Sequence, residues 1–190
     1  LQVYIQEVFV MEANTSYTDA GYDMYNDIKH RTNGEIYLGV VGPVRTGKST
    51  FIKKFMEMFV LPGIKDENDR KRAMDELPQS AEGKTIMTTE PKFIPKEAVK
   101  INLFDGNDIK VRMVDCVGYI VEDAGGLMEG ERERMVMTPW SEEPMPFAKA
   151  AEYGTKKVIH DHSTIGIVIT TDGSFGDISR QSYKAAEDKT

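Results

Sequence analysis

One stretch of eight residues constrains this chain more than any other part of its sequence: Gly42-Pro43-Val44-Arg45-Thr46-Gly47-Lys48-Ser49. The spacing of its glycines and its Lys-Ser pair is that of a Walker A loop. The preceding segment, 35–41, is apolar and β-branched, which predicts a buried strand. Apolar side chains then recur at helical spacing from 49 to 61, and Pro62-Gly63 ends the pattern. Strand, loop and helix together predict a P-loop in an α/β domain.

The residue types of the loop suit a nucleoside triphosphate with magnesium. Gly42 and Gly47 let the backbone curl, so that successive N–H groups face phosphate oxygens. Lys48 adds a positive charge at the β- and γ-phosphates, and the Ser49 hydroxyl is a magnesium ligand. Thr50, at the start of the helix, offers a hydroxyl or an amide to the α-phosphate.

A second motif begins at Asp115, which ends the apolar run 109–115. An acid at the carboxyl end of a strand beside a P-loop can hold magnesium through water. Gly118 completes an Asp-x-x-Gly sequence that resembles the third motif of GTPase-like P-loop proteins, where the glycine amide senses the γ-phosphate. A strand-terminal Asp is often only a turn cap, so this motif gains its meaning from the P-loop.

Threonines gather in a third segment, 85–89, which lies between the first helix and the next strands. In GTPase-like folds a threonine in this interval binds magnesium and responds to the γ-phosphate. Thr88 or Thr89 fits that role, although threonines also favour strand edges. Arg45 fits a solvated loop tip better than a phosphate clamp. The expected nucleotide contacts are Gly42, Arg45, Thr46, Gly47, Lys48, Ser49, Thr50 and Gly118, with Ser49 and Asp115 at the metal and Lys48, Asp115, Thr88 and Thr89 in catalysis.

The remaining pattern predicts a mainly parallel sheet with one antiparallel hairpin strand. Asp105-Gly106-Asn107-Asp108 separates two apolar runs, 99–104 and 109–114, which are expected to pair as a hairpin. The rest of the expected elements are a short helix at 22–31, a solvated helix over 65–72, a long excursion at 118–147, a helix at 147–160, a strand at 164–170 and an unfinished helix from 179. We expect residues 1–33 to be an N-terminal extension with a leader helix, of which 1–18 lie outside the fold. Residues 34–190 would form a P-loop domain of the GTPase-like (TRAFAC) type that is truncated at its C-terminus, in an N-terminal fragment of a longer protein.

Composition excludes several functions. A net charge of −7 argues against binding to nucleic acid, which needs lysine and arginine gathered on one face. No apolar run approaches the roughly 20 residues that cross a bilayer.

The single cysteine, Cys116, cannot form an intramolecular disulfide, which favours a reducing cytoplasm. It is expected to be a buried small apolar residue. His160 and His162 suit a cationic helix end better than a metal site, and the Met and Phe residues of 49–61 are expected in the core.

Whole phrases of the sequence, not only the loop, resemble one family. The segment from Gly34 to Asp177 is similar to the N-terminal ATPase domain of the stage IV sporulation protein A family, which builds the coat of bacterial endospores. The similarity is carried by four stretches: Ile36–Glu57 (IYLGVVGPVRTGKSTFIKKFME), Asp75–Phe93 (DELPQSAEGKTIMTTEPKF), Val114–Tyr119 (VDCVGY) and His162–Gly173 (HSTIGIVITTDG). The residues before about Asp19 do not match the family.

The resemblance implies an ATPase that uses ATP and Mg²⁺ and polymerises irreversibly into a basement layer around the forespore. Lys48 would be the Walker A lysine, Asp115 the Walker B acid, and Thr88 or Thr89 the sensor threonine. Members of the family work in the mother-cell cytoplasm, peripheral to the outer forespore membrane. They attach through a short amphipathic peptide and recruit other coat proteins, largely through regions beyond this segment.

Two other functions stay open on sequence alone. A GTPase switch fits the same motifs, because the base-reading Asn-Lys-x-Asp element would lie beyond the next strand, past Thr190. A structural coat protein could bind nucleotide without hydrolysing it. Ras-like GTPases have a water-orienting Gln after Asp-x-x-Gly, and this chain has Tyr119 there, so either another group positions the water or turnover is slow.

Overall fold

The computed structural model describes residues 32–78, 91–102, 108–121, 124, 126–172 and 178–187. Its central sheet has four strands in the order β2-β3-β1-β8. β1 (Glu35–Val41) runs parallel to β3 (Asp108–Asp115) and to β8 (Ile165–Val168), whereas β2 (Lys92–Asn102) is antiparallel to β3. The prediction of a mainly parallel sheet with one antiparallel hairpin strand is therefore confirmed.

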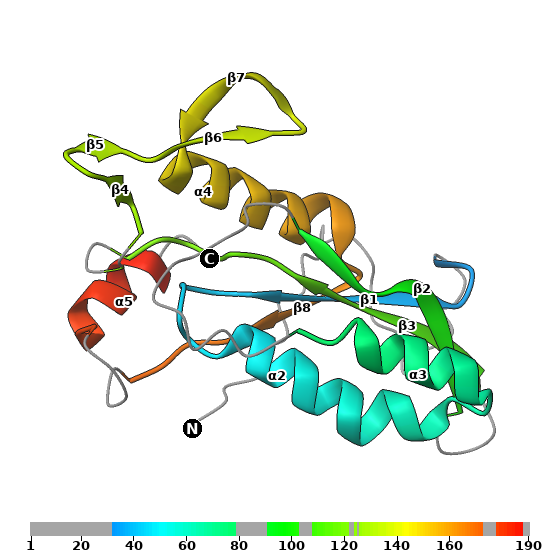
Figure 1. The fold of residues 1–190 in the computed structure, drawn as a ribbon. Coiled ribbons are helices and arrows are strands. Elements are labelled where there is room, and N and C mark those ends of the chain that lie inside the picture. Colours follow the sequence, from blue (N-terminus) through cyan, green and yellow to red (C-terminus); the bar gives the residue numbers. More distant parts are fainter. Residues whose placement is uncertain are drawn as a thin grey trace, which may run out of the picture.

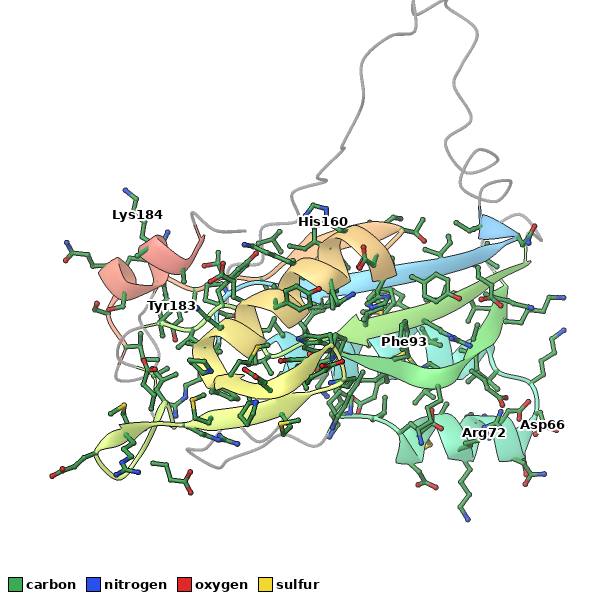
Figure 2. All side chains as sticks on the ribbon, turned by 90° about the horizontal axis from the view of Figure 1, so that it is seen from above. Asp66, Arg72, Phe93, His160, Tyr183 and Lys184 are labelled. Carbon is green, nitrogen blue, oxygen red and sulfur yellow. The ribbon has the colours of Figure 1, made fainter. Side chains whose placement is uncertain are left out.

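Helices cover both faces of this sheet (Figure 1). On one face lie α2 (Lys48–Phe55), its continuation η1 (Met56–Val60) and η2 (Leu61–Gly63), and α3 (Glu67–Asp75). Their buried side chains form the largest apolar cluster with the sheet, which includes Val40, Ile52 and Met113. On the other face lie α4 (Phe147–Lys157) and η3 (Val158–His162), where Val158 packs on Val41 and Val114. A last helix, α5 (Arg180–Glu187), lies at one end of the molecule, and α3 lies at the other (Figure 2).

The first helix corrects one prediction about the core. Its hydrogen bonding changes from α to π at Met56. A π segment takes more residues per turn, so the positions that follow are rotated relative to an α-helical pattern. Val60 is consequently buried, while Met58 and Phe59 are 65% and 59% exposed. The expectation that every Met and Phe of 49–61 is core is wrong for these two, although the Phe59 ring still contacts Phe55 at 5.2 Å between centroids.

The excursion after β3 lies outside the central sheet, as expected, but it is more ordered than the sequence suggests. It contains two two-stranded antiparallel sheets, one of β4 (Met128–Glu129) and β5 (Arg132–Glu133), the other of β6 (Met135–Thr138) and β7 (Ser141–Pro146). Trp140, in the turn between β6 and β7, lies 5.6 Å from the Tyr153 ring of α4 between centroids. β2 begins at Lys92, earlier than the apolar run 99–104 that predicted it. The residues from Lys92 to Ile94 also pair with β3, and a bulge between Ile94 and Val99 separates them from the rest of the strand.

The other predicted elements have mixed outcomes. The helices and strands expected near 65–72, 147–160, 164–170 and after 179 are present as α3, α4, β8 and α5. The helix expected at 22–31, the boundary at residue 18 and the turn at 105–107 lie outside the described residues. None of the described helices combines the length and apolar character needed to span a bilayer.

Candidate nucleotide site

The loop between β1 and α2 depends on its two glycines. Gly42 has φ +131°, and a Cβ there would lie 2.2 Å from the carbonyl oxygen of Ile169, the residue that follows β8. Gly47, with φ +91°, precedes the helix and accepts the Phe51 N–H at 2.8 Å, but it has no side chain to cap the first turn. Because the amides of a helical first turn have no intrahelical acceptor, Lys48, Ser49 and Thr50 present N–H groups at this edge.

Lys48 is a buried cation held by a backbone oxygen. Its side chain is 5% exposed, and its Nζ donates to the Pro43 carbonyl at 2.6 Å. Burial lowers the pKa of this amine, while the nearby Cys116 and Asp115 act in the opposite direction. No ion pair of Lys48 is found among the described residues. A buried charge without a paired anion is costly, so this position favours an anionic ligand.

Asp115 and Ser49 form the second part of the site. The Ser49 hydroxyl donates to Oδ2 of Asp115 at 2.9 Å, whereas the buried Oδ1 has no hydrogen-bond partner in the described structure. Burial raises the pKa of this carboxyl against the opposing effects of Ser49 and Lys48. A carboxylate oxygen without a donor beside a hydroxyl is the kind of oxygen pair that Mg²⁺ prefers. The residues present therefore fit a magnesium ion.

Gly118 lies against the P-loop, next to Gly42 and Lys48. It has φ +90°, and a Cβ at this position would lie 2.1 Å from the Gly42 carbonyl oxygen and 2.5 Å from Nζ of Lys48. Only glycine fits both that backbone conformation and that space. The Asp-x-x-Gly sequence thus comes against the P-loop, as the sequence predicted.

Tyr119, which occupies the position of the missing glutamine, is buried in an apolar cluster. Its side chain is 2% exposed and packs in an apolar cluster with Val44, Ile178 and Tyr183. Its backbone forms two hydrogen bonds with the P-loop. The Val44 N–H donates to the Tyr119 carbonyl oxygen at 2.9 Å, and the Tyr119 N–H donates to the Gly42 carbonyl oxygen at 3.2 Å. Tyr119 is therefore a core residue that holds the loop in place, and its side chain does not replace a water-positioning glutamine.

We predict that the two obvious changes at this position have opposite outcomes. Tyr119→Phe should keep ATP turnover within about twofold, because the ring stays in its cluster. Tyr119→Ala should lower the free energy of unfolding by about 3–5 kcal/mol, the usual cost of removing a buried aromatic side chain. Urea unfolding and phosphate release measure the two effects. A large loss of turnover in Tyr119→Phe with unchanged stability would show that the hydroxyl takes part in the reaction.

The other predicted residues divide into three groups. Arg45 is exposed at the tip of the loop and has φ +60°, and Thr50 is exposed on the first turn of α2. Thr46 is buried, and its hydroxyl donates to the Pro43 carbonyl at 2.9 Å instead of pointing outward. Thr88 and Thr89 lie outside the described residues. The role of Pro43, whose oxygen accepts from both Thr46 and Lys48, had no signal in the sequence because a backbone carbonyl is common to every residue.

The weaker candidates behave as ordinary structural residues. Cys116 is 7% exposed, its thiol lies 3.5 Å from the Val40 oxygen, and burial raises its pKa. His162 packs its ring against Phe93 with 5.7 Å between centroids. Asp161 pairs with Lys157 at 3.3 Å.

Comparison with known proteins places the chain in a family. The family model described as "Stage IV sporulation protein A, ATPase domain" matches residues 20–190. Stage IV sporulation protein A of Bacillus subtilis (strain 168) is 63% identical over 167 residues, which are 88% of this chain and 34% of that protein. The proteins of the same name from Clostridioides difficile (strain 630) and Bacillus anthracis are 62% and 60% identical over the same shares. No solved structure matches.

The matched family model is that of an ATPase domain, and the mixed α/β fold with its mostly parallel sheet is consistent with one. The chain belongs to the stage IV sporulation protein A family. It spans about a third of the length of the curated relatives that it matches, 34% in each case.

Proposed function

We propose that this domain is a P-loop NTPase of the GTPase-like type that binds ATP with Mg²⁺ and hydrolyses it. The observation that carries the proposal is the pairing of two buried, incompletely satisfied charges at one edge of the sheet. Among the described residues, Lys48 has only a carbonyl partner, and Asp115 has one carboxylate oxygen with no donor. A triphosphate would give Lys48 an anionic partner, and a divalent cation would give Asp115 a positively charged one.

Each residue of the site has a distinct task in this mechanism. The first-turn amides of α2 bind phosphate oxygens, and Lys48 exchanges the Pro43 carbonyl for the β- and γ-phosphates. As charge builds on the γ-phosphoryl oxygens, this buried ammonium stabilises it more strongly than a solvated one could. Gly118 leaves room for the phosphate beside Lys48, and its amide is proposed to sense that group. Thr88 or Thr89 is proposed as the sensor, and the attacking water is positioned by a group other than the Tyr119 side chain.

Ser49 and Asp115 would hold the metal, Ser49 directly and Asp115 through water. Bound there, Mg²⁺ supplies positive charge that neutralises the phosphates. We predict that Asp115→Asn keeps the shape of the side chain but lowers turnover about 10²-fold or more, since the anionic group is lost. The magnesium concentration that gives half-maximal phosphate release should rise in parallel. Asp172→Asn, at an acid after β8 and outside the proposed metal set, is the matched control and should leave that concentration unchanged.

At the level of the whole protein, we propose that hydrolysis drives self-assembly of the coat basement layer on the forespore surface. What supports this is membership of the family together with an ATPase domain. The mother-cell cytoplasm as its location, a short amphipathic membrane-anchoring peptide and further coat proteins as partners belong to the same proposal, through regions outside this segment.

Phosphate release and sedimentation of the full-length protein, each with ATP and with GTP, separate the candidate functions. The proposal expects release and pelleting with ATP and much less with GTP. Equal or greater activity with GTP would favour a GTPase switch. Pelleting that needs no triphosphate, without phosphate release, would favour a structural protein with a non-hydrolysing site.

A further inference from the structure

A pocket of about 350 Å³ lies on the face of the central sheet that carries α4 and η3. Ligand pockets in proteins have volumes of this order. Its walls combine three aromatic rings with a cation, an acid and a hydroxyl. The residues that supply these groups are Tyr37, Phe93, His162, Arg112, Asp161 and Thr164.

The alternation of side chains along β3 separates this pocket from the nucleotide site. Val114 packs on Val158 of η3, so Arg112, two residues earlier, points to the same face of the sheet. Met113 packs with the cluster under α2, and Asp115 shares its side of the strand. The pocket and the proposed magnesium ligands therefore lie on opposite faces of the sheet.

The Arg112 guanidinium is held by two aromatic rings, but its Nε has no acceptor. Its Cζ lies 5.7 Å from the centroid of the Tyr37 ring and 5.9 Å from that of the Phe93 ring, distances at which a cation is attracted to an aromatic face. The Nε atom is buried and has no hydrogen-bond partner in the part of the chain that the structure describes. A buried donor without an acceptor is costly, so this nitrogen favours a ligand that accepts a hydrogen bond.

Two acidic side chains lie near the guanidinium, and both already have other partners. One carboxylate oxygen of Glu35 accepts from the Tyr37 hydroxyl at 2.6 Å, and the other lies 3.5 Å from Nζ of Lys110. Asp161 forms an ion pair of 3.3 Å with a lysine one turn earlier. No ion pair of Arg112 is found among the described residues. Arg112 can therefore offer its charge to an anion that enters the pocket.

Thr164 supplies a second donor beside this cation. Its Oγ1 accepts the Tyr37 N–H at 3.2 Å, and its own N–H donates to the Tyr37 carbonyl oxygen at 2.8 Å. These two bonds fix Thr164 against Tyr37, which is the direct partner of Arg112 in the β1–β3 ladder. Since Oγ1 acts as the acceptor in the first bond, the hydroxyl proton remains for a ligand.

The shape and charge of these groups favour a carboxylate over a phosphate. Nε and a terminal nitrogen of a guanidinium match the two oxygens of a carboxylate in one plane. A phosphate group carries more negative charge near neutral pH, and Glu35 and Asp161 would repel the excess. The rings of Tyr37, Phe93 and His162 favour an apolar or aromatic body next to the anionic group.

We propose that this pocket binds a monocarboxylate with a small apolar or aromatic body, held by the Arg112 guanidinium and the Thr164 hydroxyl. The inference goes beyond the proposed nucleotide chemistry and does not depend on it. The carboxylate can belong to a free small acid or to the C-terminus of a peptide, which present the same group to the arginine.

The first test compares three probes on the full-length protein by isothermal titration calorimetry. Benzoate should bind at least about tenfold more tightly than its neutral analogue benzamide, because only the carboxylate accepts two charge-assisted hydrogen bonds. It should also bind at least about tenfold more tightly than inorganic phosphate, which brings more charge close to the two acids. Equal affinity for benzoate and benzamide, or tighter binding of phosphate, would overturn the inference.

The second test places the carboxylate in the pocket. Arg112→Lys keeps the positive charge but loses the planar pair of donors, so its affinity for benzoate should fall by about tenfold or more. Lys65→Gln removes an exposed charge on the face of α2 and α3, and it should bind benzoate like the wild type. Lys48→Ala should do the same, because the P-loop lies on the other face of the sheet. Full affinity in Arg112→Lys, or lost affinity in Lys48→Ala, would contradict a site at this pocket, whatever the outcome of ATP assays.

A short peptide that ends in phenylalanine distinguishes the two sources of the carboxylate. Tighter binding of this peptide than of benzoate would show that the pocket takes a chain terminus, and the reverse order would show that it takes a free acid. In both cases the C-terminal amide of the peptide should bind at least about tenfold more weakly than the free carboxylate. An amide that binds as tightly as the free carboxylate would contradict recognition of the carboxylate by Arg112.

Discussion

Replacing Lys48 by alanine should lower ATP hydrolysis by about 10²–10³-fold or more, because the buried ammonium is the strongest positive charge at the phosphate edge. The same substitution should not lower the stability of the fold. Burial lowers the pKa of Lys48, which means that the fold penalises its charged form. We therefore expect the thermal midpoint of the nucleotide-free variant to be no lower than that of the wild type. Phosphate release and differential scanning calorimetry provide the two measurements.

The matched control for this change is Lys54→Ala on the same helix. Lys54 is exposed and bonds Glu57, so its loss should change turnover by less than about twofold and stability by less than about 0.5 kcal/mol. Turnover by Lys48→Ala equal to that of Lys54→Ala would mean that the P-loop lysine does not act on the reacting phosphate.

Gly118→Ala should inactivate the site and weaken the fold together. The new Cβ would meet a backbone oxygen of Gly42 at 2.1 Å and displace Nζ of Lys48, which lies 2.5 Å away, at a residue with φ +90°. The positive φ costs about 1–2 kcal/mol and the overpacking about 1–3 kcal/mol. We expect a loss of about 2–5 kcal/mol in urea unfolding and a loss of ATP affinity measured by calorimetry.

Substitutions at two other glycines distinguish the cost of the positive φ from the cost of overpacking. Gly130 has φ +66°, but no atom lies within 4 Å of the place that a Cβ would occupy, so Gly130→Ala should show only the backbone cost. Gly166, on β8, has open space and no positive φ, so its replacement by alanine should change stability by less than about 1 kcal/mol. Neither should alter ATP binding. Equal effects of all three substitutions would contradict the close approach of Gly118 to the P-loop.

Local sequence was enough to predict the elements around the loop. A β-branched run followed by Gly42 predicted β1 with its bounds, and Asp115 at the end of an apolar run was expected beside the loop, where the structure places it 2.9 Å from Ser49. These predictions succeeded because strand, turn and helix are each specified by neighbouring residues. The antiparallel pairing of β2 and β3 was predicted in the same way, from the Asp-Gly-Asn sequence between the two apolar runs.

What the sequence did not reveal depends on contacts between distant segments. Tyr119 was considered for its place after Asp-x-x-Gly, yet its burial against Val44 and Tyr183 requires α5 to pack beneath the loop. Phe59 fitted a helical core pattern, and only the change to π hydrogen bonding at Met56 turns it outward. The short strands β4 to β7 lack long apolar runs, so their pairing could not be read from periodicity.

Amide hydrogen exchange of the full-length protein with and without Mg²⁺ and ATP tests the location of the site most directly. The first-turn amides of α2 at Lys48, Ser49 and Thr50 have no intrahelical acceptor and should gain strong protection on binding. Protection should extend to Gly118, and it should be weak or absent in Lys48→Ala. ATP binding that leaves these amides unprotected, with protection appearing elsewhere in the chain, would contradict a nucleotide site at the P-loop.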